Sequence, residues 1–130
     1  MKFRYKKYGP GVLRPVIPIE VIKNDLEVPY EVLIDSGADL CIFDAHIAEI
    51  LGIDVVKGER REVSGLTGFP EFYYLHDISI KVGGLKYKVK VGFMSMRGNA
   101  YGIVGQNGFF DKFVVKFDLQ KEDVELKERI

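Results

Sequence analysis

The sequence contains a single cysteine, Cys41, and no tryptophan in 130 residues. One cysteine excludes an internal disulfide, which favours a reducing compartment. The chain also lacks an apolar run long enough to span a bilayer, and its basic start, Met1 to Lys7, lacks the apolar core of a signal peptide. We therefore expect a soluble cytoplasmic protein with no membrane partner.

Net charge is the second absence. The 19 Lys and Arg residues balance 19 Asp and Glu residues. No general attraction to nucleic acid is therefore expected, and only a local basic patch could bind it. Hydrophobic residues make up 47% of the chain and charged residues 29%, values typical of a globular protein. The length fits one domain, residues 1–130, which is large enough to bury an independent core.

What the chain does have is an apolar stretch that ends in an acid. Val32, Leu33 and Ile34 predict a strand that is buried on both faces. Asp35 follows directly, and Gly37 favours a tight turn just after it. Because a carboxylate is rarely placed beside a core without a partner, Asp35 is the first candidate for chemistry.

The periodicity along the chain predicts a mostly β fold with one main helix. Residues 43–52 have apolar positions three and four apart, with Asp44 as N-cap and Gly52 as C-cap. A second, short helix is expected over residues 105–112. Strands or extended segments are expected at residues 2–8, 12–23, 26–34, 54–63, 75–82, 85–91, 103–104, 113–117 and 124–126.

Prolines and glycines punctuate this pattern. The two prolines in residues 12–23 make that segment an edge or bulged strand, because proline donates no ladder hydrogen bond. Gly83 and Gly84 predict the turn of a hairpin. Residues 64–70 have two glycines around an apolar residue, the composition of a hairpin tip that can reach over a cleft. An ordinary surface turn fits the same residues equally well.

Two motifs together resemble those of the retropepsin-like aspartic proteases. Asp35-Ser36-Gly37-Ala38 follows the apolar strand, and Tyr101-Gly102-Ile103-Val104-Gly105 supplies the later apolar-apolar-glycine element. The residues after it, 106–118, are similar to the short helix and return strand of cellular and prokaryotic single-lobe relatives. The resemblance covers residues 12–127 and implies an acid-protease fold, a closed β-barrel with one main helix and ψ-loops.

The resemblance also implies roles for individual residues. It makes Asp35 the catalytic carboxylate, has Ser36 cross-link paired loops by hydrogen bonds, and has Gly37 bring its backbone close to Asp35. Asp39 matches a later acid of the family that is commonly structural. The residues implied to line the substrate-binding cleft are Ala38, Asp39, Ser64, Gly65, Leu66, Thr67, Gly68 and Ile103.

The implied chemistry needs two carboxylates. Hydrolysis of an amide by water uses a base for the water and an acid for the carbonyl, and two nearby carboxylates that share one proton supply both. The chain has one Asp-Ser-Gly, so the resemblance implies a homodimer in which the two copies of Asp35 meet at a two-fold axis. The implied activity is that of an aspartic endopeptidase acting on peptides or proteins, with no metal or organic cofactor.

Three other interpretations stay open. Asp35 can be a structural acid at a strand-to-turn junction, in a non-catalytic dimerisation or peptide-binding module with the same fold. A metal site could draw on acids and histidines, although no His-x-x-x-His spacing is present. Cys41 could act as a nucleophile, but its apolar setting favours a buried, inert thiol. The candidate metal ligands are Asp35, Asp39, Asp44, His46 and His76.

Overall fold

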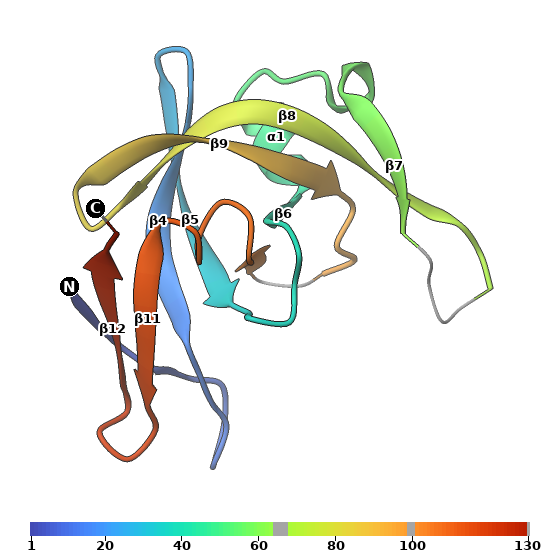
Figure 1. Ribbon diagram of the computed structural model, residues 1–130. Coiled ribbons are helices and arrows are strands. Elements are labelled where there is room, and N and C mark those ends of the chain that lie inside the picture. The colour runs from blue at the N-terminus through green and yellow to red at the C-terminus, as the bar shows by residue number, and fades with distance from the viewer. Residues whose placement is uncertain (64–67, 99–100, 130) are drawn as a thin grey trace.

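Six strands close into a barrel in the computed structural model, which describes residues 1–63, 68–98 and 101–129 (Figure 1). Each strand of the ring pairs with the next, and the last pairs back to the first. This closure confirms the predicted mostly β barrel. The strands are, in ring order, β4 (Val16–Lys23), β5 (Leu26–Ile34), β10 (Gly102–Val104), β6 (Ile42–Asp44), β9 (Leu85–Met94) and β8 (Glu71–Val82).

Two tight hairpins contribute four of these strands, and their turns lie where the sequence predicts them. Gly83 and Gly84 have φ values of 54° and 92° between β8 and β9, a conformation that glycine adopts without a Cβ clash. Asn24, with φ of 56°, turns the chain from β4 into β5. Alternate side chains of β8 point into the barrel, where Ile80 and Val82 are fully buried.

Strand β10 carries the part of the topology that positions the site. It lies between β5 and β6, which follow one another in the sequence. It runs parallel to β5, with Ile103 opposite Leu33, and antiparallel to β6, with Ile103 opposite Ile42. This ψ-loop arrangement places the end of β5 beside the end of β10, although the two segments are far apart in the sequence.

Shorter elements flank the barrel. They are β1 (Lys2–Arg4), β2 (Lys6–Lys7), β3 (Leu13–Arg14), α1 (Ala45–Ile50), the 3-10 helix η1 (Val55–Lys57), β7 (Glu59–Val63), β11 (Phe113–Asp118) and β12 (Asp123–Glu128). A three-stranded sheet has the order β1-β12-β11, and β7 forms a hairpin with β8. Figure 1 shows this small sheet and the β7–β8 hairpin on opposite sides of the barrel.

The main helix is shorter than the sequence pattern predicts. α1 begins at Ala45, because residues 42–44 form β6 and pair with β9. Asp44 is the N-cap, as predicted, and its side chain accepts a hydrogen bond from the second N–H of the helix at 3.1 Å. The C-cap is one residue earlier than expected, and Gly52 follows it with φ of 72°. Within the described residues, neither this helix nor any other has the length and apolar character to cross a membrane.

Three other segments have a secondary structure that differs from the predicted one, and the difference lies at a proline, a turn or a glycine. Pro15 separates β3 from β4 within the strand expected over residues 12–23. The extended segment expected over residues 54–63 begins with η1 and becomes a strand only at β7. Residues 105–112 form consecutive turns in place of the expected short helix, because Gly108 has φ of 108°, outside the helical region.

Aromatic side chains fill the interior of the barrel. Phe43, Phe93, Phe109 and Phe113 are all fully buried. The rings of Phe43 and Phe93 meet edge to face with their centroids 6.2 Å apart, which joins β6 to β9. Phe109 and Phe113 belong to the same buried cluster, so the turns after β10 are packed onto the core and do not lie loose on its surface.

Candidate active site

Asp35 lies where β5 stops. β5 and β10 run parallel as far as Ile34 and Val104, and the Asp35 N–H donates a hydrogen bond to the Val104 carbonyl at 3.0 Å. Ile34 is buried, whereas Asp35 is partly exposed. The acid therefore leaves the core at the end of a rigid strand, which is the position that the sequence pattern indicates.

The turn after Asp35, residues 35–38, orients the carboxylate. The Gly37 N–H donates to Asp35 Oδ1 at 2.9 Å, and the Ala38 N–H donates to the Asp35 carbonyl at 3.2 Å. A Cβ at Gly37 would lie 3.2 Å from Oδ1, so a larger residue would crowd the carboxylate. Ser36 and Gly37 are both exposed. The backbone thus holds one carboxylate oxygen while the turn faces outward.

A second turn, which follows β10, supports the Asp35 turn. Gln106 donates from its backbone N–H to the Ala38 carbonyl at 2.8 Å and from its side-chain Nε2 to the Ser36 carbonyl at 2.5 Å. Asn107 donates to the Asp39 carbonyl from its backbone N–H at 2.9 Å and from Nδ2 at 3.1 Å. These four hydrogen bonds fix the backbone on which the candidate catalytic residue sits.

Sequence reasoning did not assign Gln106 and Asn107 to the site, although two amide side chains directly after an apolar-apolar-glycine element were an available signal. Gly105 before them lets the two turns approach. A Cβ there would lie 2.4 Å from the Ala38 carbonyl oxygen and 2.6 Å from that of Leu40. Asp39 is exposed and enters this network through its backbone carbonyl.

Tyr30 is a further residue that sequence reasoning missed. Its ring fills the space beside Gly102, where a Cβ would lie 2.6 Å from ring atom Cε2. Its hydroxyl accepts a hydrogen bond from the Asp44 N–H at 3.1 Å, and burial raises the pKa of Tyr30 to about 12. One side chain of β5 therefore contacts both β10 and β6. Strand periodicity does not distinguish it from other aromatic residues.

Two hollows of about 310 Å³ each lie between the barrel and the β7–β8 hairpin. We call them the Asp39 hollow and the Ile103 hollow, and they share Ile42 and Val63. The other residues that line the Asp39 hollow include Ala38, Asp39, Leu40 and Tyr73. The other residues that line the Ile103 hollow include Glu71, Met94, Met96 and Ile103. The two hollows together form a mainly apolar cleft beside the Asp35 turn.

The predicted substrate-binding residues divide into three groups. Ala38, Asp39 and Ile103 line the cleft. Gly68 is exposed, with φ of 75°, and does not line either hollow. Residues 64–67, which complete the predicted set, lie outside the described residues. The pairing of β7 with β8, with Val63 opposite Glu71, forms the hairpin that the tip was expected to close.

The structure does not assemble the alternative metal site. The Asp44 carboxylate accepts hydrogen bonds from the backbone N–H groups of His46 at 3.1 Å and Met96 at 2.9 Å. His76 Nε2 lies 2.8 Å from the Val55 carbonyl oxygen. Within residues 1–63, 68–98 and 101–129, no three His, Cys, Asp or Glu side chains gather as a metal site would need.

Cys41 has the environment of an inert thiol. It is 0% exposed, its Sγ lies 3.5 Å from the Asn107 carbonyl oxygen, and burial raises its pKa to about 11. Because the thiolate is the reactive form, we expect the native protein to react with DTNB at pH 8 about a hundredfold more slowly than the urea-unfolded chain. Absorbance of the released thiolate measures both rates, and equal rates would contradict the burial and restore Cys41 as a candidate nucleophile.

Comparison with known proteins gives one family match. Residues 17–107 match the family described as aspartyl protease. This span contains the Asp35 turn together with Gly105, Gln106 and Asn107, so it includes both turns of the site. No curated protein matches the sequence.

Solved structures share the fold at low sequence identity. A retropepsin-like aspartic protease from Rickettsia conorii is 16% identical, with a TM-score of 0.69 over 97% of this chain and 89% of that one. The retroviral protease-like domain of Ddi1 from Leishmania major is 17% identical, with a TM-score of 0.59 over 88% of each chain. The EIAV protease complexed with the inhibitor HBY-793 is 22% identical, with a TM-score of 0.51 over 77% of this chain and 88% of that one. The barrel is thus that of retropepsin-like proteins.

Proposed function

The chain belongs to the aspartyl protease family, and from this premise we propose that it is an endopeptidase that works as a homodimer. One observation carries the proposal: Asp35 is held at the end of a core strand, with one carboxylate oxygen bound by Gly37, on a turn whose next two residues are exposed. This is half of a two-carboxylate site. A second copy, related by a two-fold axis, supplies the other half.

The chemistry follows from two copies of Asp35 close together. Two carboxylates at short distance repel each other when both are ionised, so the pair holds one proton between them. The ionised carboxylate takes a proton from water as the water attacks the peptide carbonyl, and the protonated one donates to the carbonyl oxygen. The roles then reverse as the tetrahedral intermediate collapses and the leaving nitrogen is protonated. Protons balance, and the dyad regains its single shared proton.

The cleft fits an extended peptide. Its roof is the β7–β8 hairpin and its floor includes Ala38 and Ile103, so an extended chain can lie between them and pair with main-chain groups. Met94, Met96 and Ile42 favour apolar side chains near the cut. We assign the tip of the hairpin, 64–70, the role of a flap that closes over bound substrate.

We place the dimer contact on the free edge of β11. Within the part of the chain that the structure describes, β11 pairs only with β12, and it exposes Val114 (47%) and Phe117 (42%). The other edge of this sheet is the three-residue β1, where exposed Lys2 and Arg4 would face like charges in a symmetric pair. β11 also follows directly on the turns at 105–112, which hold the Asp35 turn through Gln106 and Asn107.

The combined change Val114→Lys and Phe117→Lys is expected to weaken dimerisation by about a hundredfold. Each substitution replaces an exposed apolar group on this edge with a positive charge, and symmetric pairing of the two edges brings these like charges close together. Sedimentation equilibrium measures the dissociation constant, and peptide cleavage is expected to fall in parallel at low protein concentration. Val56→Lys is the matched control, because Val56 is 67% exposed in η1, away from β11. Equal dissociation constants for the edge variant and the control would contradict the assignment.

A peptide library tests the proposed activity itself. We expect mass spectrometry to find internal cleavage with apolar residues on either side of the cut, and a specific activity that rises with protein concentration around the dimer dissociation constant. A dimeric protein that cleaves no peptide in mildly acidic or neutral buffer would instead indicate a non-catalytic dimerisation or peptide-binding module.

A further inference from the structure

Gly92 lies inside strand β9, where a glycine weakens a sheet because it has no side chain to pack. The sequence pattern predicts a strand that ends at residue 91, but β9 continues through Gly92 to Met94. Gly92 is buried and pairs on both sides, with Leu75 of β8 and Ile42 of β6. Its φ lies outside the positive range that favours glycine. Backbone conformation therefore does not explain this glycine, and a close approach by other side chains does.

Two side chains of the cleft occupy the space beside Gly92. A Cβ at this position would lie 2.6 Å from Cδ2 of Tyr73 and 2.8 Å from Cδ1 of Ile42. Ile42 can move its terminal methyl by a change of rotamer. The Tyr73 ring, whose Cγ would be only 3.3 Å away, has to move as a whole. The missing side chain at Gly92 thus lets the Tyr73 ring lie against β9.

The position of these two side chains decides how much room the cleft has. Tyr73 and Ile42 both line the Asp39 hollow, whereas Gly92 lines neither hollow of the cleft. A Tyr73 ring that is pushed off Gly92 moves away from β9 and into the hollow that it lines. Gly92 therefore sets the depth of the Asp39 hollow from outside it.

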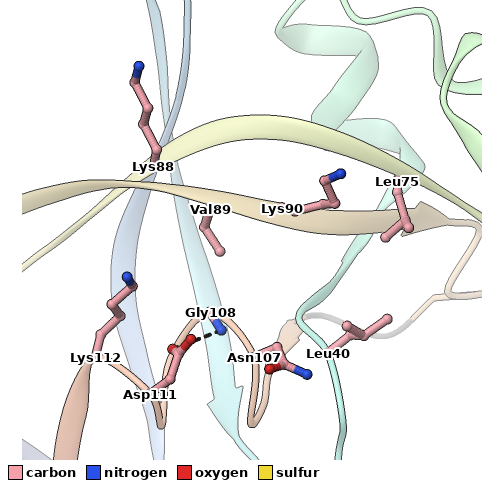
Figure 2. A pocket seen from close by; sticks show the side chains of 9 residues that line it. All are labelled: Leu40, Leu75, Lys88, Val89, Lys90, Asn107, Gly108, Asp111 and Lys112. Carbon is pink, nitrogen blue, oxygen red and sulfur yellow. Dashed lines mark hydrogen bonds between the residues drawn. The ribbon is translucent and has the colours of Figure 1, made fainter.

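Apolar side chains continue from the Asp39 hollow to the space under β9. Leu40 lines the Asp39 hollow and also a third hollow, of about 310 Å³, between β9 and the turns at 105–112. Figure 2 shows Leu40 and Leu75, the cross-strand partner of Gly92, toward the same end of this third hollow. A large apolar side chain in the Asp39 hollow meets the Tyr73 ring and Leu40, so its burial there is favourable.

We propose that Gly92 determines the size specificity of the cleft: it leaves room for the Tyr73 ring against β9, and so makes the Asp39 hollow deep enough for a large apolar side chain of the substrate. The inference rests on the proposed function, because the cleft is taken to hold a peptide. Gly92 acts through Tyr73 and touches no substrate itself. In a two-fold symmetric dimer each chain supplies one such hollow, so the preference is expected at one position on each side of the cut.

Cleavage of paired peptides tests this role of Gly92. Peptides of one sequence carry Phe or Ala at a single position, which is moved residue by residue across the cut. For the wild type, kcat/KM is expected to be about thirtyfold higher with Phe than with Ala at the position that enters the Asp39 hollow. For Gly92→Ala this ratio is expected to fall to about threefold, through a lower kcat/KM for the Phe peptide. The ratio of two rates on one preparation does not depend on the fraction of protein that is folded.

Gly102→Ala is the matched control for the steric change. Gly102 is also a buried strand glycine, and a Cβ there would lie 2.6 Å from the Tyr30 ring. Tyr30, however, lines neither hollow of the cleft. The control is expected to lose stability in thermal unfolding, as Gly92→Ala does, and to keep the wild-type ratio of Phe to Ala.

Removal of the Tyr73 ring tests the same hollow without a change in β9. Tyr73→Ala is expected to enlarge the Asp39 hollow, so that Trp is accepted about tenfold better relative to Phe than in the wild type. This variant keeps the proposal testable where Gly92→Ala does not fold. Where it does fold, adding Tyr73→Ala to Gly92→Ala removes the displaced ring and is expected to return most of the preference for Phe over Ala.

The role of Gly92 would be overturned by a Gly92→Ala protein that keeps the wild-type ratio, or by a Gly102→Ala protein that loses it to the same extent. Fluorescence anisotropy with the same peptides, labelled and bound to Asp35→Asn protein, separates this from failure of the proposed function. A preference for Phe that appears in binding and that Gly92→Ala removes, in a protein that cleaves nothing, would retain the role of Gly92 and lose the peptidase. Wild-type protein that cleaves Phe and Ala peptides equally at every position would retain the peptidase and lose the role of Gly92.

Discussion

The Asp35→Asn variant is expected to hydrolyse peptides about a thousandfold more slowly than the wild type. The amide that replaces the carboxylate neither accepts a proton from water nor shares one with its partner across the axis. Its side-chain oxygen can still accept the hydrogen bond that Gly37 donates at 2.9 Å, so the turn and the fold are expected to persist. Initial rates of peptide cleavage, together with thermal unfolding, separate loss of chemistry from loss of structure.

Asp25→Asn is the matched control for this prediction. Asp25 is an exposed aspartate in the turn between β4 and β5, so its amide variant is expected to keep the wild-type rate. Cleavage by Asp35→Asn at a rate close to that of Asp25→Asn would show that the hydrolysis does not use Asp35. The acid would then be the structural residue that its strand-to-turn position also allows.

The Gly105→Ala variant is expected to lower the free energy of unfolding by about 3 kcal/mol and to remove activity at the same time. The added Cβ would lie 2.4 Å from the Ala38 carbonyl oxygen and 2.6 Å from that of Leu40. Both obstacles are backbone atoms that a rotamer change cannot move. The turns must separate, and the hydrogen bonds from Gln106 to Ala38 and Ser36 lengthen as they do.

Urea unfolding of Gly105→Ala and Gly52→Ala separates steric from conformational effects. Gly52 has φ of 72° and no atom within 4 Å of an added Cβ. The Gly52→Ala variant is therefore expected to lose only about 1 kcal/mol of unfolding free energy, because alanine is strained in the left-handed conformation. If Gly105→Ala loses no more stability than Gly52→Ala, the close approach of the two turns is not tight enough to fix Asp35.

The parts of the fold that could be predicted are those whose cause is local. Gly83 and Gly84 supply the positive φ that their hairpin turn needs, and Asp44 caps its helix with its own side chain. The end of β5 at Asp35 follows from the change from apolar residues to Asp-Ser-Gly. The resemblance to retropepsin-like proteases adds the closed barrel, whose ring is completed by the non-local pairing of β4 with β8.

What could not be predicted depends on contacts between distant segments. A short helix is expected over residues 105–112, but the chain forms turns there, in which Gly108 has φ of 108° and packs against Val89 and Cys41. Gln106 matters because it reaches backbone carbonyls of the Asp35 turn, and a sequence does not show which carbonyls need a donor. Tyr30 matters because its ring fills the space beside Gly102, a contact that the sequence does not show. In each case the partner lies on another strand or turn.

The measurement that tests the central claim most directly is a subunit-mixing titration. Wild-type protein at fixed concentration, above the dimer dissociation constant, is equilibrated with increasing Asp35→Asn protein and assayed for peptide cleavage. If both copies of Asp35 serve one site, mixed dimers are inactive, and a tenfold excess of the variant reduces activity to about a tenth by mass action. Asp35→Asn that also carries Val114→Lys and Phe117→Lys is the control, and it is expected not to inhibit because it does not pair. Activity that stays constant as the variant is added, while sedimentation shows that mixed dimers form, would contradict the shared dyad.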